Sequence, residues 1–280
     1  MPSFIRFATR VRPFFQLEHV CIVNILAGRR LVPELLQKGL RVIDLSADFR
    51  FTDVSRYEAV YQPHAAPALL DKAVYGLSEV YAERIGSARL VGNPGCYPTS
   101  VLLPLIPLIR HGLVSPINLV ADAKSGVSGA GRSLSLAAHF CEVSESFKPY
   151  KVAQHRHNPE MDEQLGLVAG YAVHITFVPH LVPMSRGMLA TSYAQIMPSV
   201  GYRHILECLN DCYGACPFAR LCGDDRIPDT RNVQPLSKRS QSIQPHDQYG
   251  LWHSSSWACS VERSRPAGKS DHGPGGRTPS

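Results

Sequence analysis

The sequence predicts an α/β protein whose sheet or sheets are covered by helices. Short apolar segments alternate with amphipathic segments through the middle of the chain, and glycine- and proline-containing turns separate them. The 280 residues are 44% hydrophobic, which is enough for one large core or two modest ones. Strands that alternate with helices are typical of an α/β or α+β fold.

The first half of the chain contains the clearest alternation. In chain order we expect a helix over Leu31–Lys38 ended by Gly39, a strand over Arg41–Ser46, a strand over Arg89–Val91, a turn over residues 92–95 and a buried helix over Tyr97–Ile109. Pro104 and Pro107 should kink that last helix or end its first part, because proline removes a backbone donor.

The second half continues the pattern. We expect strands over Asn118–Ala123, Tyr171–Val178 and Leu189–Ile196, a helix that starts at Pro159 with Asn158 as its N-cap, and a helix over His204–Tyr213. Residues 235–280 are rich in Ser, Pro, Gly, Arg, Gln and His without periodicity, so we expect an unstructured tail there.

The formal charge of +6 does not indicate nucleic-acid binding. Residues 31–234 hold 18 basic and 19 acidic side chains, so the excess positive charge lies at the two ends. A nearly neutral middle offers no electrostatic surface for nucleic acid. The sequence also shows neither a long apolar segment nor a signal peptide, which predicts a cytoplasmic protein that does not bind membranes.

Eight cysteines are present, and we expect reduced thiols because a chain of this length can form a core without disulfides. Cys208, Cys212 and Cys216 recur every four residues on a predicted helix, and Cys222 follows soon after. A metal cluster is one interpretation of this spacing, and buried small apolar side chains are the favoured one, so no metal site is predicted.

Cys96 is the candidate nucleophile. It lies in GNPGCYPT (residues 92–99), where two glycines permit a tight turn and Pro98 suits the first turn of a helix. Backbone N–H groups at a helix start can lower a thiol pKa and hold an oxyanion. An ordinary structural cysteine in a strand-to-helix turn is the alternative interpretation.

His155 and His157 are the candidate acid–base residues, in the run HRHNPE (residues 155–160). An imidazole on the loop before a helix can accept a thiol proton and later donate one. Arg156 between them could pair with a phosphate or carboxylate. The alternative interpretations are a solvated basic loop and, less favoured, a metal site.

A glycine-rich loop, SGVSGAGR (residues 125–132), follows a predicted strand and could approach a ligand closely. It matches neither G-x-G-x-x-G nor a P-loop, and a flexible connection is the alternative. Arg50, Arg132 and Arg186 are further candidates to hold substrate anions, although each alone is more often a surface residue.

Five motifs together resemble one enzyme family, N-acetyl-γ-glutamyl-phosphate reductase, from about residue 31 to residue 234. The motifs, in order, are RVIDLSADFR (41–50), GNPGCYPT (92–99), SGVSGAGR (125–132), HRHNPE (155–160) and PHLVPMSRG (179–187). The resemblance implies a truncated Rossmann-type nucleotide-binding domain plus an α+β catalytic domain like that of glyceraldehyde-phosphate dehydrogenase.

The domains implied are an unmatched segment over residues 1–30, a remnant of the NADP-binding domain over 31–95, a catalytic and dimerisation domain over 96–234 and the tail over 235–280. By the same resemblance, Cys96 would be the nucleophile, with His157 favoured over His155 for proton transfer. Ser125 and Gly126 would lie near the nicotinamide of NADPH. Arg156, Arg186, Arg50 and Arg132 would contact the small acyl phosphate.

The implied reaction is the NADPH-dependent reduction of N-acetyl-γ-glutamyl phosphate to the semialdehyde, through a cysteine thioester, in a homo-oligomer. The family's G-x-x-G-x-x-G turn does not occur in the first 90 residues, and the family's closing strand and helix do not follow Gln234. The abrupt junctions indicate altered reading frames or a mis-annotated or decayed gene. We therefore expect a chain that keeps its catalytic residues but has lost most of its NADPH site.

Three alternatives remain from the sequence. A reductase of carrier-bound aminoadipyl or glutamyl phosphate would share the fold and the cysteine. An aspartate-semialdehyde dehydrogenase matches the cysteine and histidine motifs less well. A non-catalytic remnant that only dimerises with a full-length homologue belongs to a different functional class.

Overall fold

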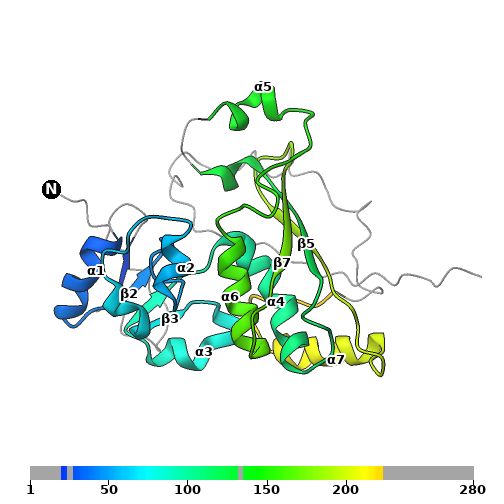
Figure 1. Ribbon diagram of the computed structural model, residues 1–280, viewed down its shortest axis with the longest axis horizontal. Coiled ribbons are helices and arrows are strands. Elements are labelled where there is room, and N and C mark those ends of the chain that lie inside the picture. The colour runs from blue at the N-terminus through cyan, green and yellow to red at the C-terminus, as the bar shows by residue number, and fades with distance from the viewer. Residues whose placement is uncertain (1–19, 24–27, 132–134, 223–280) are drawn as a thin grey trace, which may run out of the picture.

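The computed structural model describes residues 20–23, 28–131 and 135–222, and it confirms the predicted α/β class (Figure 1). Two four-stranded sheets lie on either side of two central helices, α4 and α6. The strands are β1 Val20–Val23, β2 Arg41–Asp44, β3 Ala73–Tyr75, β4 Leu90–Gly92, β5 Leu119–Ser125, β6 Lys148–Pro149, β7 Ile175–Leu181 and β8 Met188–Tyr193.

The helices include longer ones that cover the sheets and several short ones. They are α1 Gly28–Gln37, α2 Val54–Glu58, η2 Pro67–Lys72, α3 Ser78–Ser87, α4 Cys96–Arg110, η3 Val127–Ala130, η4 Leu136–Ala138, α5 Phe140–Val143, α6 Asn158–Ala169 and α7 Tyr202–Tyr213. Within the described residues, none of these helices has both the length and the apolar composition needed to cross a membrane.

The first sheet is wholly parallel, with strand order β1-β2-β4-β3. Its strands are short apolar runs, and β4 is buried along its whole length. Parallel strands require crossover connections, which α1 and α3 supply here. Because carboxyl ends of parallel strands meet at one edge, Asp44 and Gly92 lie side by side, where the loops that follow them form the site.

Strand β1 lies inside the segment predicted to be unmatched. It pairs with β2 in register, with Val20 opposite Arg41 and Val23 opposite Asp44. Four β-branched or small apolar residues form this strand, too few for the sequence pattern to separate them from their neighbours. The parallel sheet therefore begins earlier in the chain than residue 31.

The second sheet is mixed, with order β6-β7-β5-β8. Strands β5 and β7 are parallel, and β8 runs antiparallel to β5. Along β5 alternate residues are buried, so one face of the sheet packs against helices and the other is more open. The side chains of Leu189 and Tyr193 on β8 are exposed.

Helix α4 is the centre of the larger hydrophobic core. Val101, Leu102 and Ile106 are fully buried, and the helix contacts α6, α7 and β8. It runs from Cys96 to Arg110, so neither Pro104 nor Pro107 ends its first part, which was one of the two effects predicted for them. Burial of this apolar helix on several sides outweighs the missing backbone donors of the two prolines.

Most predicted elements are present with shifted ends. Strand β7 starts at Ile175 rather than Tyr171, and β8 ends at Tyr193 rather than Ile196. The expected tail, Arg132 and residues 1–19 and 24–27 lie outside the described residues.

Candidate active site

Cys96 is the first residue of α4, directly after the turn that ends β4. The turn is held tightly against the first sheet: Asn93 N–H donates to the Asp44 carbonyl at 2.8 Å. A Cβ at Gly92 would lie 1.9 Å from the carbonyl oxygen of Phe49, so only glycine fits there. The parallel sheet thus fixes where the thiol emerges.

The thiol of Cys96 is held in its protonated form. Burial raises its pKa, while the Tyr97 backbone N–H and the Arg50 charge lower it to a smaller extent. Part of the side chain is exposed, but protein atoms crowd the remaining sides, so loss of hydration prevails. The backbone N–H groups at the helix start lower the pKa of this thiol as expected, but burial raises it by more.

His157 lies against Gly95, the residue that precedes the candidate nucleophile. A Cβ at Gly95 would lie 2.7 Å from Nε2 of His157, so glycine permits the ring to approach the start of α4. The Nδ1 atom of His157 is buried and has no hydrogen-bond partner among the described residues. A buried acceptor of this kind is available to a substrate or a proton.

His155 accepts a hydrogen bond from the backbone of His157. The backbone N–H of His157 donates to Nδ1 of His155 at 3.1 Å, which leaves the proton of a neutral His155 on Nε2. Burial lowers the pKa of His155 to about 4, aided by Arg156 and Lys151. Burial also lowers the pKa of His157 to about 2, aided by His155 and Arg50. Both rings are neutral near pH 7.

Helix α6 starts one residue earlier than predicted. Its N-cap is His157, and Asn158 is its first helical residue rather than its cap. The Asn158 amide instead donates to Oδ1 of Asp162 at 3.3 Å and to the Ile175 carbonyl at 3.2 Å, which ties α6 to β7. The two histidines therefore sit at the helix start, not on a free loop.

Glu160 is a site residue that the sequence reasoning missed. Its carboxylate accepts from Gly95 N–H at 2.9 Å, from the Tyr75 hydroxyl at 2.7 Å and from Arg50 at 3.2 Å. The side chain is almost fully buried. Its position in the HRHNPE motif, one helical turn after His157, is the signal that could have identified it.

Arg50 joins the first sheet to α6. Its guanidinium donates to the Asn93 carbonyl at 2.7 Å, the Leu45 carbonyl at 3.3 Å and the Glu160 carboxylate at 3.2 Å. These contacts give Arg50 a structural role that the predicted substrate contact did not include. Arg50 also lowers the pKa of the Cys96 thiol, so its charge acts on the candidate nucleophile.

Two tyrosines connect the cysteine turn to the glycine-rich loop. The Tyr97 hydroxyl lies 3.0 Å from the Tyr150 hydroxyl, and the Ser125 side chain is close enough to lower the pKa of Tyr97 against the larger effect of burial. Tyr97 also packs edge-on against both His155 and Phe177. Ser125 is therefore brought to the same site as Cys96, although the two residues lie on different elements.

The glycine-rich loop packs against the last of the five motifs. Gly126 N–H donates to the Gly187 carbonyl at 3.0 Å, and a Cβ at Gly126 would lie 2.8 Å from the backbone nitrogen of Arg186. The Arg186 and Arg156 side chains are exposed, and Arg156 lowers the pKa of both site histidines. Arg132 lies outside the described residues.

A dinucleotide fits the described residues only in part. Pyrophosphate binds where a glycine-rich turn joins a strand to a helix N-terminus. The described residues of the parallel sheet supply no such turn, because the connection at residues 92–95 presents Cys96 and the connection after β3 holds a single glycine, Gly76. Ser125 and Gly126 could line a nicotinamide ring but do not hold a pyrophosphate.

The arrangement suits acyl transfer to sulfur. A thiol at the first residue of a buried helix faces backbone N–H groups that can stabilise an oxyanion. A neutral imidazole with an unpartnered nitrogen, as far as the described residues show, lies beside it. The fold and the site together define a protein with a nucleotide-binding type of parallel sheet, a mixed-sheet domain and a cysteine–histidine site where the two meet.

Two family models match this chain. The semialdehyde dehydrogenase dimerisation domain matches residues 96–249, more than half of the chain, and the semialdehyde dehydrogenase NAD-binding domain matches residues 26–88. The chain belongs to the semialdehyde dehydrogenase family.

Several curated relatives are similar over most of the chain. The N-acetyl-gamma-glutamyl-phosphate reductase of Desulforapulum autotrophicum is 54% identical over 202 residues, which is 72% of this chain and 59% of the relative. The reductase of the same name from Syntrophobacter fumaroxidans is 51% identical over 208 residues, 74% of this chain and 60% of the relative. The chain therefore spans about 60% of the length of these relatives.

A solved structure confirms the fold. Aspartate semialdehyde dehydrogenase II from Vibrio cholerae superposes with a TM-score of 0.55 and 13% sequence identity, covering 75% of this chain and 65% of that protein.

Proposed function

We propose that this chain forms a thioester on Cys96 with the acyl group of N-acetyl-γ-glutamyl phosphate. This is the first half of the reduction that yields the semialdehyde, with NADPH as the family's hydride donor. The single observation that supports the proposal best is the placement of Cys96 at the start of α4. The preceding Gly95 donates its N–H to Glu160 and lies against the ring of His157.

The acyl-transfer step balances with the residues present. Cys96 gives its proton to an imidazole, the sulfur attacks the acyl carbon, and the bond between that carbon and the phosphate oxygen breaks. Inorganic phosphate leaves with the electron pair, and the product is a thioester. Backbone N–H groups at the start of α4 stabilise the oxyanion that forms on the way.

His157 is the residue that we assign to proton transfer. Its ring lies against Gly95, and its Nδ1 atom has no partner among the described residues. A pKa of about 2 in the free protein makes it a weak base, and the negative charge of a bound acyl phosphate would raise that pKa. Substrate binding thus prepares the imidazole for its role.

The acyl group and its contacts are inferred from the relatives and the exposed arginines. The relatives are named for N-acetyl-gamma-glutamyl phosphate, which carries a phosphate and a carboxylate. Arg156 is exposed between the two histidines that precede α6, and Arg186 is exposed beside the glycine-rich loop that follows Ser125. Arg132 belongs to that loop in sequence. We propose that these guanidinium groups bind the two anions, with Arg50 adding positive charge behind the thiol.

The cellular setting follows from the same family. A biosynthetic reductase with free thiols suits the cytoplasm, and the seven cysteines in the described residues are all free. The matched dimerisation domain and the exposed Leu189 and Tyr193 on β8 support self-association through the open face of the second sheet.

The acyl-transfer step can be tested without NADPH. Purified chain is mixed with excess N-acetyl-γ-glutamyl phosphate, and phosphate release is measured in the first turnover against the buffer hydrolysis rate. The expected result is a rapid release of about one phosphate per chain, followed by slower hydrolysis of the thioester.

Two variants decide what that release means. Cys96→Ser should abolish the rapid phase, whereas Cys141→Ser should keep it, because Cys141 is an exposed thiol on α5. Equal rapid phases in both variants would refute the assignment of Cys96. Release from carrier-bound acyl phosphates alone, and none from the free compound, would favour the other reductase class.

A further inference from the structure

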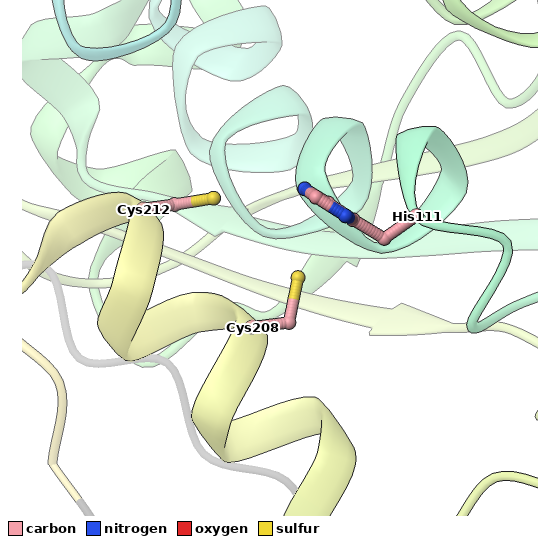
Figure 2. Close-up of side chains that lie close together, drawn as sticks. All are labelled: His111, Cys208 and Cys212. Atoms are coloured by element: carbon pink, nitrogen blue, oxygen red, sulfur yellow. The ribbon is translucent and has the colours of Figure 1, made fainter.

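The far end of the nucleophile's helix meets two cysteines that the proposed function does not use. Figure 2 shows His111, the C-cap residue of α4, with its ring directed toward Cys208 and Cys212 on α7. One ligand atom from each residue lies within 4.8 Å of the other two. The sequence interpretation treated these cysteines as buried apolar residues and did not include His111.

The three side chains come from two elements that the core already fixes. Cys208 and Cys212 are four residues apart on α7, so both thiols lie on the same face, one turn apart (Figure 2). Helix α7 packs on α4 through buried Ile205 and Leu209, which sets the distance between that face and His111. The cluster is therefore positioned by packing and not by flexible loops.

The ligand set is typical of a thiophilic cation. Thiolate and imidazole are the ligands that Zn²⁺ prefers, and two cysteines with one histidine is a known three-residue set. In a tetrahedral zinc site, ligand atoms lie about 3.5 to 3.8 Å apart, given bond lengths near 2.0 and 2.3 Å. Because the three ligand atoms already lie within 4.8 Å of one another, small side-chain movements would bring them to this spacing.

From this geometry we infer that His111, Cys208 and Cys212 bind one divalent zinc-type cation, with solvent as the fourth ligand. The exposure of His111 leaves room for that solvent ligand. The site lies at the opposite end of α4 from Cys96, about 22 Å away for a helix of 15 residues. The metal would therefore join α4 to α7 and take no part in acyl transfer.

Local charges are compatible with a cation. Asp211, three residues after Cys208 on α7, adds a negative charge close to this cluster. Arg110 precedes His111 and opposes a cation, but it is exposed. Metal binding would release the thiol protons, as thiolate ligation requires.

The test uses the full 280-residue chain, reduced and freed of metal with a chelator, then titrated with Co²⁺ as a spectroscopic probe for zinc. We expect one Co²⁺ per chain, with a thiolate charge-transfer band and the visible bands of tetrahedral cobalt. Zn²⁺ should displace the cobalt and remove both. Wild-type protein that shows no charge-transfer band would overturn the inference.

Variants identify the ligands. Cys208→Ser and Cys212→Ser should each lose the tetrahedral spectrum, and His111→Asn should lose or weaken it. Cys216→Ser is the matched control, since Cys216 is also half-buried beside α7 but bonds to the Cys212 carbonyl at 3.6 Å. Loss in Cys216→Ser equal to that in Cys208→Ser would overturn this set of ligands.

A measurement on unaltered protein removes the risk that a variant fails to fold. Cysteine alkylation is mapped by mass spectrometry with and without Zn²⁺. Zinc should protect Cys208 and Cys212 and leave Cys96 and Cys216 as reactive as before. Protection that falls on other cysteines, or on none, would refute the site whatever the variants show.

Discussion

Cys96 shows how one side chain responds to opposing forces. Burial raises the pKa of the thiol, and the Tyr97 backbone N–H and Arg50 offset only part of that increase. Position at a helix start therefore does not by itself make a reactive thiolate. In the proposed reaction, the Cys96 thiol therefore becomes a thiolate only when its proton passes to a histidine of the substrate site.

The raised pKa predicts the pH dependence of Cys96 alkylation. Because only thiolate reacts, the rate with iodoacetamide should rise through about pH 8 to 9 and show no plateau below the usual thiol range. The rate is followed by peptide mapping of Cys96, with the exposed Cys141 as the internal comparison. A plateau for Cys96 already reached near neutral pH would contradict this prediction.

The two site histidines predict an acid-sensitive fold. Their pKa values are lowered to about 4 for His155 and about 2 for His157. In the unfolded chain both rings take up a proton as the pH falls through about 6.5, whereas in the folded chain they stay neutral. Stability is then complete above pH 6.5 and is lost as the pH falls toward 4, by about 1.4 kcal/mol per pH unit for each histidine.

Urea unfolding between about pH 7 and pH 4.5 measures this effect. His157→Gln should reduce the slope of unfolding free energy against pH, whereas His139→Gln should keep it, because the His139 side chain is exposed. An unchanged slope in His157→Gln would show that the ring is not held neutral.

Among the elements, the turn after β4 matters most for the site. Gly92 ends β4 where a Cβ would meet the Phe49 carbonyl at 1.9 Å, and the neighbouring Asn93 anchors the turn to β2. A Cβ at Gly86 on α3 would instead have no atom within 4 Å. Gly92 is therefore required by the close approach of the Phe49 backbone, whereas Gly86 has space for a side chain.

Alanine substitutions separate these purposes. Gly92→Ala should destabilise the protein by several kcal/mol and slow acylation of Cys96, because backbone has to move. Gly86→Ala should stabilise α3 by about 0.5 to 1 kcal/mol, since alanine favours helix. Thermal unfolding of both variants measures the difference, and comparable midpoints would contradict the packing described here.

Apolar periodicity and turn residues are local signals, and from them the sequence predicted five of the eight described strands and the helices α1, α4, α6 and α7. It placed the end of β8 and the start of β7 wrongly, since sheet pairing decides those boundaries. It missed the ten-residue helix α3, and it missed β1, β3 and β6, which are four, three and two residues long. Such short strands are defined by their neighbours in the sheet and not by their own pattern.

The site was predicted where its residues share a motif, and it was missed where contacts are long-range. Cys96, His155 and His157 could be proposed from local runs, and the structure brings all three to the start of α4 and α6. The link from Glu160 to Gly95 spans 65 positions, and that from Arg50 to Glu160 spans 110. No local pattern predicts those pairs.

At the scale of the whole molecule, the Arg50–Glu160 pair joins the parallel sheet to the helices of the mixed-sheet domain. Both side chains are buried, so loss of one partner would leave a buried charge without compensation. This contact keeps the cysteine turn and the histidine helix in one arrangement, although they belong to different sheets.

We predict that the chain binds NADPH weakly. The 280 residues contain no G-x-x-G-x-x-G turn before residue 90, and the described residues supply no substitute for it. NADPH should therefore bind this chain more weakly than the micromolar range, as followed by its fluorescence on titration. Micromolar binding by the 280-residue chain would show that another segment holds the pyrophosphate.

The proposed acylation of Cys96 does not require NADPH. The most direct measurement is the intact mass of the chain after brief exposure to N-acetyl-γ-glutamyl phosphate and acid quenching, with peptide mapping of the adduct. We expect one N-acetyl-glutamyl group per chain, attached at Cys96 and removed by hydroxylamine, which cleaves thioesters. An adduct on another cysteine, or an unmodified chain that still releases phosphate, would contradict the claim.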